Sequence, residues 1–211
     1  MLSHLIFMAV ANPIHRLTEA EYLEIERRAE FRSEFLDGEM FAMPEGTKSH
    51  GRVKCNLITV LSTRLKGCSC RVYDSDMRVK VQASGLYTYP DVSIARGEDQ
   101  LEDEHEDTLL NPTIIFEVLS ESREAYDRGK KFEIYRRLPS LCEYILVNQF
   151  KPLVEQFIRQ ESGQWILRDV EGLEEKLTLP SIDVTIAMAD VYSDIRFAPD
   201  PRRPDAAGGR S

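Results

Sequence analysis

The sequence predicts an α/β protein with a mixed β-sheet and helices packed against it. Segments that alternate apolar and polar residues, as strands do, are interspersed with segments whose apolar residues recur every three or four positions, as in helices. Their order is irregular, unlike the strict strand–helix alternation of an all-parallel sheet. The composition agrees, since 211 residues, 42% of them hydrophobic and 30% charged, are enough for one domain with a buried core.

We expect one folded domain over residues 17–195. Residues 1–16 are expected to be a flexible leader, because their apolar run is interrupted by His4 and carries no basic segment of a signal peptide. Residues 196–211 end in a Pro- and Gly-rich stretch and are expected to be a disordered tail. No run approaches the roughly 18–20 apolar residues of a membrane span. Together with four cysteines that lack zinc-binding or redox spacing, this predicts a cytoplasmic protein.

The first third of the chain predicts two helices and a hairpin. Thr18 precedes a glutamate by three residues, which is the capping-box pattern, and we expect a helix over residues 19–29. The pair Asp37-Gly38 between two short apolar runs is typical of a β-hairpin turn. Further on, apolar residues recur at helical spacing before Gly67 ends the segment: Val53, Leu57, Val60, Leu61 and Leu65.

The middle of the chain predicts strands around an acidic loop. Alternating residues on both sides of Asp74-Ser75 indicate two strands, and another is expected to start at Pro90, where a missing N–H is harmless. Seven carboxylates between residues 98 and 107 predict a solvated loop, because like charges so dense repel one another. The apolar run TIIFEVLS that follows is expected to be a buried central strand.

The last part of the chain predicts a helix, a three-stranded meander, a further strand and a short final helix. Ser122 is expected to cap a helix that runs to about Leu138. The segments CEYILVNQ, LVEQFIRQ and QWILRDV are expected to form a three-stranded meander. The segment EKLTLPSIDVTIAMADVY predicts a last strand and a short final helix.

A glutamate inside the buried strand indicates a functional site. Glu117 lies between two apolar segments, where an unpaired carboxylate would cost several kcal/mol. On the next helix, at about 100° per residue, Lys131 falls among apolar side chains and points toward the sheet. We therefore expect the two charges to meet. The apolar side chains of that arc are Phe132, Ile134, Tyr135 and Leu138.

A third charged residue, Asp91, follows Pro90 at the start of its strand. Two carboxylates at the ends of neighbouring strands can bind Mg²⁺ through hard oxygen ligands. A lysine beside them can polarise or deprotonate a metal-bound water and offset the charge of a pentavalent phosphate. Asp91, Glu117 and Lys131 therefore predict phosphodiester hydrolysis. The alternative is a buried structural ion pair, with Asp91 capping its strand.

The motifs around these residues resemble the Uma2 family (DUF820) of the PD-(D/E)XK nuclease superfamily. They are PDVSI, FEVLS and DRGKKFEIY, with 26 residues from Asp91 to Glu117. The segments LTEAEYLEIE, EFLDGEMFAM, SHGRV and CEYILV resemble Uma2 segments in the same order, so the likeness covers residues 17–192. The resemblance implies a restriction-endonuclease-like core, a mixed β-sheet flanked by helices, with a divalent metal (Mg²⁺ or Mn²⁺) at one end.

The resemblance also implies roles for single residues. Asp91 and Glu117 become the metal ligands. The lysine usual two positions after that glutamate is absent, because Leu119 stands there. Lys131 matches the K-x-x-x-Y pattern that takes its place in Uma2-like proteins. Its neighbour Lys130 lies at the edge of the helix arc and is the less favoured candidate.

Two further residues match polar positions of the family. Glu34, in SEFLDGE, is expected as an accessory residue that contributes to the metal site. Its alternative is a cap or a hairpin salt bridge. His50, near the start of the second helix, is expected to contact phosphate or to orient a ligand, and its alternative is a capping histidine on the surface.

The charge of the chain restricts how it could bind DNA. A net charge of −9 repels polyanions, so DNA binding needs bound cations or a local basic surface. Residues 123–137 carry six basic and three acidic side chains. Within them Arg123, Arg128 and Lys130 are expected to contact the phosphate backbone, and a solvated helix face is the alternative.

The functional prediction is a metal-dependent endonuclease that hydrolyses DNA. A homodimer is expected by resemblance, because cleavage of two strands is commonly divided between two copies, and no membrane partner is expected. The alternatives are a non-catalytic interaction protein on a nuclease-like scaffold and a hydrolase for a small phosphodiester.

Overall fold

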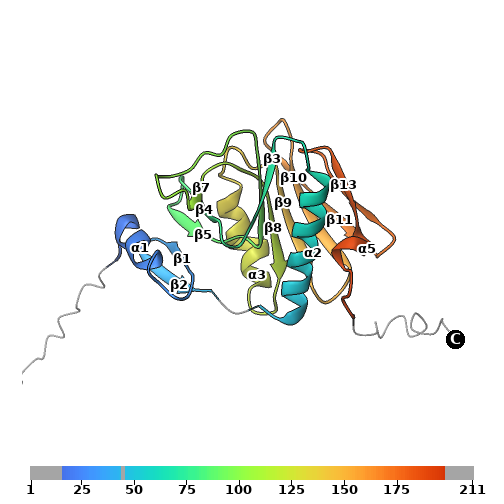
Figure 1. Ribbon diagram of the computed structural model, residues 1–211, viewed down its shortest axis with the longest axis horizontal. Coiled ribbons are helices and arrows are strands. Elements are labelled where there is room, and N and C mark those ends of the chain that lie inside the picture. The colour runs from blue at the N-terminus through green and yellow to red at the C-terminus, as the bar shows by residue number, and fades with distance from the viewer. Residues whose placement is uncertain (1–15, 44–45, 198–211) are drawn as a thin grey trace, which may run out of the picture.

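The computed structural model describes residues 16–43 and 46–197 (Figure 1). The expected leader and tail therefore lie outside the described residues, except for Arg16, Arg196 and Phe197. The domain limits at 17 and 195 remain a prediction.

A six-stranded mixed sheet forms the main layer. Its members are β3 (Cys70–Asp74), β6 (Val92–Arg96), β8 (Pro112–Leu119), β9 (Glu143–Asn148), β10 (Leu153–Arg159) and β11 (Trp165–Glu171), in the order β11-β10-β9-β8-β6-β3. Only β8 and β9 run parallel, and the other neighbours in this sheet are antiparallel. The predicted mixed sheet and the meander of β9, β10 and β11 are confirmed. All eight residues of β8 are buried, as a central strand requires.

The helix α2 (Lys48–Arg64) covers one face of this sheet, as predicted from its apolar spacing. Val53, Leu57 and Leu61 are fully buried against side chains that β6 and β8 direct to this face. The hairpin β12 (Lys176–Leu179) and β13 (Val184–Ala187) and the helix α5 (Met188–Val191) complete the same core. The prediction of a single last strand was wrong, because Asp183, with φ 53°, turns the chain between two short strands.

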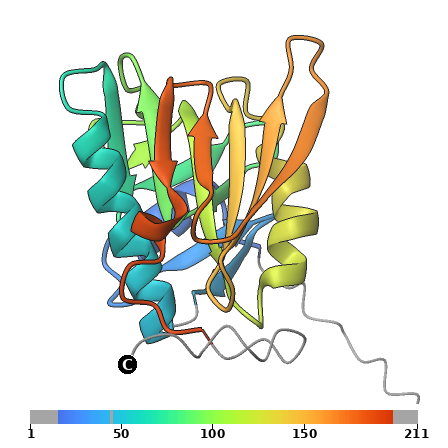
Figure 2. The same ribbon diagram turned by 90° about the vertical axis from the view of Figure 1, so that its right-hand side faces the viewer.

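A segmented helix covers the opposite face (Figure 2). It consists of α3 (Glu124–Tyr126), the π-helical turn η1 (Asp127–Lys131) and α4 (Phe132–Tyr135). The predicted cap at Ser122 was wrong, since Arg123 holds the cap position and makes no side-chain cap bond. The inward direction of Lys131 is confirmed, because it is only 1% exposed. Ile134 and Tyr135 of this segment are buried, and so is Leu138, which follows it.

A second sheet packs beside the first with the order β2-β1-β5-β4-β7. Its strands are β1 (Ser33–Leu36), β2 (Glu39–Ala42), β4 (Arg78–Val81), β5 (Leu86–Thr88) and β7 (Thr108–Leu109), and α1 (Glu19–Glu26) precedes it. The capping box of α1 is confirmed, with Thr18 as the N-cap residue. The predicted hairpin turn is confirmed as well, since Asp37 and Gly38 have φ of 52° and 83°. The strands around Asp74-Ser75 belong to different sheets, so the chain crosses between the layers there.

The acidic loop is held by cations rather than solvated throughout. Arg27 of α1 binds Asp107 and Asp103 with N–O distances of 2.8 and 2.7 Å. Arg78 of β4, only 2% exposed, binds Asp107 at 2.8 Å. The expectation of a solvated loop was therefore wrong for residues 103 and 107, because basic residues from distant segments offset their repulsion. These ion pairs fasten the loop to α1 and the second sheet.

No helix within residues 16–43 and 46–197 combines the length and the apolar composition that a membrane crossing requires.

The Asp107 ion pairs predict an acid-sensitive contribution to stability. Burial raises the pKa of Asp107, but the hydrogen bond from Arg27 and the charge of Arg78 outweigh it and hold this pKa below its usual value. A carboxylate with a lowered folded-state pKa stabilises the fold above its unfolded pKa of about 3.9, and this contribution is lost as pH falls toward the folded pKa. We expect Asp107→Asn to lower the free energy of unfolding by about 2 kcal/mol at pH 7.

Urea unfolding at pH 7, 4 and 2.5 checks this. The difference between Asp107→Asn and wild type should shrink below about pH 4. Glu104→Gln, at an exposed position of the same loop, is the control and should have no effect at any of the three pH values. Equal effects of the two substitutions would contradict the assignment.

Candidate active site

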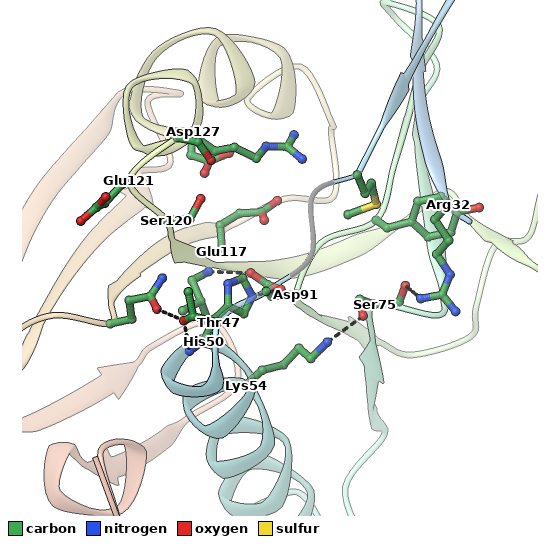
Figure 3. A pocket seen from close by; sticks show the side chains of 18 of the residues that line it. Arg32, Thr47, His50, Lys54, Ser75, Asp91, Glu117, Ser120, Glu121 and Asp127 are labelled. Atoms are coloured by element: carbon green, nitrogen blue, oxygen red, sulfur yellow. Dashed lines mark hydrogen bonds and ion pairs between the residues drawn. The ribbon is translucent and has the colours of Figure 1, made fainter. Parts of the chain in front are cut away.

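A cavity of about 870 Å³ lies at the carboxyl-terminal ends of the parallel strands β8 and β9. Its wall includes Val118 and Ser120 from the end of β8, and Gln149 and Phe150 after β9. Residues of α2, of the helical segment 123–131 and of the N-terminal segment complete it (Figure 3). The cavity therefore lies where the two sheets and both covering helices meet.

Asp91 and Glu117 face this cavity from neighbouring strands. In the antiparallel pairing of β6 with β8, Val92 lies opposite Phe116. Asp91 immediately precedes Val92 and Glu117 immediately follows Phe116, so both acids stand at the same end of this pairing. The backbone N–H of Val118 donates to Asp91 Oδ2 at 2.8 Å. Both carboxylates line the cavity, where Figure 3 shows them beside each other. The sheet register thus brings the two acids together across 26 residues of sequence.

Lys131 reaches the same point from the helical segment. Its Nζ lies 2.7 Å from Glu117 Oε1, 3.1 Å from Glu34 Oε1 and 3.8 Å from Asp127 Oδ1. Burial alone would lower the pKa of Lys131, but these three carboxylates outweigh it and raise the pKa well above its usual value. Lys131 is therefore a fixed positive charge that keeps its proton at neutral pH.

Of the three carboxylates around Lys131, Glu117 lies nearest to its ammonium. Its Oε1 also accepts a hydrogen bond from the hydroxyl of Tyr135 at 2.9 Å. Burial raises the pKa of Glu117, the charge of Lys131 opposes this, and the nearby Asp127 and Asp91 add to it. Because negative charge accumulates at this end of the sheet, a cation in the cavity would be stabilised there.

Glu34 lies behind Lys131 rather than on the cavity wall. It is 4% exposed on β1, accepts a hydrogen bond from Thr88 at 2.5 Å and pairs with Arg123. Burial raises its pKa, but Lys131 and then Arg123 lower it to about 2. Glu34 therefore stays ionised and fixes the ammonium of Lys131, and its expected contribution to a metal site remains a prediction.

His50 contacts Asp91 instead of capping its helix. Its Nε2 lies 2.7 Å from Asp91 Oδ1. Thr47 is the N-cap residue of α2 and accepts from the backbone N–H of His50 at 3.1 Å. The capping alternative for His50 was therefore wrong. Its ring, together with the N–H of Val118, fixes the orientation of Asp91 in the cavity.

The predicted phosphate-binding residues are already engaged in ion pairs. Arg128 binds Glu155 at 2.6 Å, and Lys130 lies 3.6 Å from Glu133 with about half of its side chain exposed. Of the three expected residues only Arg123 lines the cavity. Their contact with DNA remains a prediction, and little of their charge is unpaired.

Sequence reasoning missed cavity residues, among them Lys54 and Asp127. Lys54 lies on α2, donates to the hydroxyl of Ser75 at 2.9 Å and has no carboxylate partner among residues 16–43 and 46–197. Asp127 is 4% exposed and lines the cavity from η1. Both stand four positions from a predicted residue, His50 and Lys131, on the same helix, so helical spacing was the signal that could have found them.

The donor groups of the cavity suit magnesium. Among the described residues no set of three or more His, Cys, Asp and Glu side chains is arranged to hold a metal ion. Asp91 and Glu117 nevertheless offer two carboxylates on one cavity wall. Mg²⁺ is commonly bound through one or two carboxylates, with waters and substrate phosphate as its other ligands. This pair therefore fits the metal that the resemblance implies.

The fold and the site together define a protein of the restriction-endonuclease-like class. A crystal structure of a "putative nuclease belonging to DUF820" from Anabaena variabilis superposes with a TM-score of 0.69 over 84% of this chain and 98% of that chain. At 17% sequence identity this likeness shows the fold alone.

The chain belongs to the Uma2 family, described as "Putative restriction endonuclease", which matches residues 19–189. Two relatives come from Synechocystis sp., and both are called uncharacterized proteins. One, slr1290, is 31% identical over 88% of this chain and 96% of its own length. The other, sll1609, is 36% identical over 74% of this chain and 88% of its own length.

The Lys131 ion pairs predict a large effect on stability. Lys131→Met removes the ammonium and leaves Glu117 buried without its counter-ion, while Glu34 keeps only Arg123. Breaking a buried ion pair by removing one partner costs about 3–5 kcal/mol, which we expect as the loss in the free energy of unfolding at pH 7. Urea denaturation followed by circular dichroism measures it.

The adjacent lysine provides the control. Lys130→Met changes the same side-chain type at an exposed position and should alter stability by less than about 0.5 kcal/mol. A Lys131→Met protein as stable as wild type would show that the ammonium is not the counter-ion of these acids.

Proposed function

We propose that this protein is a metal-dependent endonuclease that hydrolyses DNA phosphodiester bonds. The observation that carries the proposal is the meeting of three groups in one cavity. Asp91 immediately precedes β6, Glu117 lies in the paired strand β8, and the ammonium of Lys131 lies 2.7 Å from Glu117. Membership of a family described as a restriction endonuclease supports the same reaction class.

In this proposal Asp91 and Glu117 hold Mg²⁺ or Mn²⁺. The ion, when bound, supplies a Lewis acid that activates water and offsets charge on the phosphate. His50 and the N–H of Val118 keep the Asp91 carboxylate directed into the cavity, and Tyr135 does the same for Glu117. The acids are thus pre-oriented by the fold.

Lys131 acts as a positive charge beside the reacting phosphate. Its ammonium is held by three carboxylates and stays protonated, so of its two expected roles we retain charge stabilisation and positioning, and not deprotonation of water. A fixed charge in a buried site stabilises negative charge that develops in the transition state without reorganising.

DNA is the proposed partner. We propose that the ammonium of Lys54 binds a phosphate of the DNA backbone inside the cavity. A protein of net charge −9 repels DNA over most of its surface. A half-buried lysine without a carboxylate partner among the described residues offers a phosphate contact inside the cavity. Such binding weakens as salt rises, since cation–phosphate contacts release counter-ions. A homodimer, which would divide the cleavage of two strands, is part of the proposal.

Plasmid cleavage tests the proposal. Purified wild type is incubated with supercoiled DNA and Mg²⁺ or Mn²⁺, beside Asp91→Asn and Glu117→Gln. Each substitution removes a proposed ligand charge at nearly constant volume, and we expect the nicking rate to fall at least about a hundredfold. Glu161→Gln changes an exposed carboxylate outside the cavity, and as the matched control it should keep wild-type activity.

Equal nicking by every variant would assign the activity to a contaminant. Two other results would favour different functions. Cleavage of a chromogenic phosphodiester without cleavage of plasmid would indicate a hydrolase of small phosphodiesters. A folded wild type inactive on both substrates with either metal would indicate an interaction protein on a nuclease-like scaffold.

A further inference from the structure

We propose that Asp127 accepts the proton of the attacking water. This inference rests on the proposed function and adds a catalytic residue that the motif resemblance does not assign a role. Hydrolysis needs a group that takes a proton from the attacking water, and Asp127 lines the same cavity as the proposed metal ligands.

The position of Asp127 is set by the π-helical turn. In η1, Asp127 and Lys131 are both buried, and Asp127 also lines the cavity. The hydroxyl of Tyr144 on β9 donates to the backbone carbonyl of Asp127 at 3.0 Å, which anchors the turn to the sheet. Figure 3 shows the Asp127 side chain on the same side of the cavity as Glu117 and Ser120.

The carboxylate of Asp127 has unused hydrogen-bonding capacity. Its Oδ1 is buried without a hydrogen-bond partner in the part of the chain that the structure describes. Lys131 Nζ lies 3.8 Å from this atom, which is too far for a hydrogen bond. Buried polar atoms are rarely left unpaired, and an unpaired one requires an explanation such as a catalytic role.

The other acids of the site are more fully engaged. Asp91 uses one oxygen for Val118 and the other for His50. Glu117 Oε1 is held by Lys131 and by Tyr135, and its role is that of a metal ligand. Glu34 does not line the cavity and is bound by Thr88 and by two cations. Among the buried acids of the site, Asp127 is therefore the one with the most freedom to bind a water.

The surroundings also make Asp127 more basic than an ordinary aspartate. Burial raises its pKa, the charges of Lys131 and Arg123 lower it, and Glu34 and Asp91 raise it. The balance is a raised pKa, and a more basic carboxylate accepts a proton more readily. The titratable groups that face it come from β1, β6, β8, β9 and its own helical segment: Glu34, Asp91, Glu117, Tyr144, Arg123, Tyr126 and Lys131.

The proposed step is balanced in atoms and charge. The water oxygen forms a bond to phosphorus while one of its protons passes to a carboxylate oxygen of Asp127. The bond between phosphorus and the leaving sugar oxygen breaks, and that oxygen takes a proton from solvent. Asp127 then returns its proton to solvent, leaving a phosphomonoester and an alcohol.

The pH dependence of Asp127→Asn distinguishes this role from a structural one. The amide keeps the size of the side chain but cannot accept a proton. We expect the cleavage rate at pH 7 to fall by about 10²–10⁴-fold. The deficit should shrink about tenfold for each pH unit up to pH 9, because hydroxide from solvent replaces the lost acceptor.

Glu34→Gln is the matched control. It also removes a buried carboxylate that contacts Lys131, but one that does not line the cavity. Its rate deficit should stay constant between pH 7 and 9. The inference is overturned if Asp127→Asn cleaves at the wild-type rate, or if its deficit is also independent of pH.

A second variant guards against misfolding of the first. Asp127→Ala opens space in the cavity wall, and added formate should restore part of the cleavage rate by supplying a carboxylate. A failure of rescue in a folded Asp127→Ala protein would also overturn the inference. If wild type cleaves DNA and Asp91→Asn does not, the proposed function holds. The results for the Asp127 variants then test only the role of Asp127. If wild type is inactive, both proposals fail.

Discussion

The ammonium of Lys131 is the interaction on which the structure depends. It joins Glu117 of β8, Glu34 of β1 and Asp127 of its own turn, so one buried charge connects both sheets and the covering helix. Three carboxylates crowded at one sheet end would repel one another without it. The ammonium of Lys131 offsets the repulsion between these carboxylates. It also lines the cavity, where it would contact a bound phosphate. In the proposed reaction, one group would therefore serve both stability and chemistry.

The sheet register explains why distant residues form a site. Antiparallel pairing of β6 with β8 places Asp91 and Glu117 at the same end of this pairing, and parallel pairing of β8 with β9 leaves their carboxyl ends open together. Carboxyl-terminal ends of adjacent parallel strands are a common place for ligands in open sheets. Here the two covering helices approach the same end, and each supplies residues to it, His50 from one and Lys131 from the other.

Glu117 and Lys131 could be predicted from the sequence because each is a charged residue at a position where the surrounding pattern is apolar. Glu117 interrupts an apolar strand and Lys131 interrupts an apolar helix face, so each signals a partner. Glu34 and His50 were found only through resemblance, and their partners, Lys131 and Asp91, depend on the sheet order. The π-helical turn at Asp127 and the short strand β5 left no periodic signal, because five and three residues are too few to define a period. The cation partners of the acidic loop were missed because Arg27 lies 80 residues before Asp107.

The place of Glu34 has a consequence for how the Lys131 site is assembled. This residue belongs to a hairpin that lies 83 residues before the strand of Glu117, yet it holds the ammonium in place. A partly folded chain whose first hairpin has not docked therefore lacks a correctly placed charge, even if the large sheet is complete. The Lys131 ion-pair network is therefore complete only when the amino-terminal hairpin is packed against the large sheet, so substitutions that loosen this hairpin would also disturb the cavity.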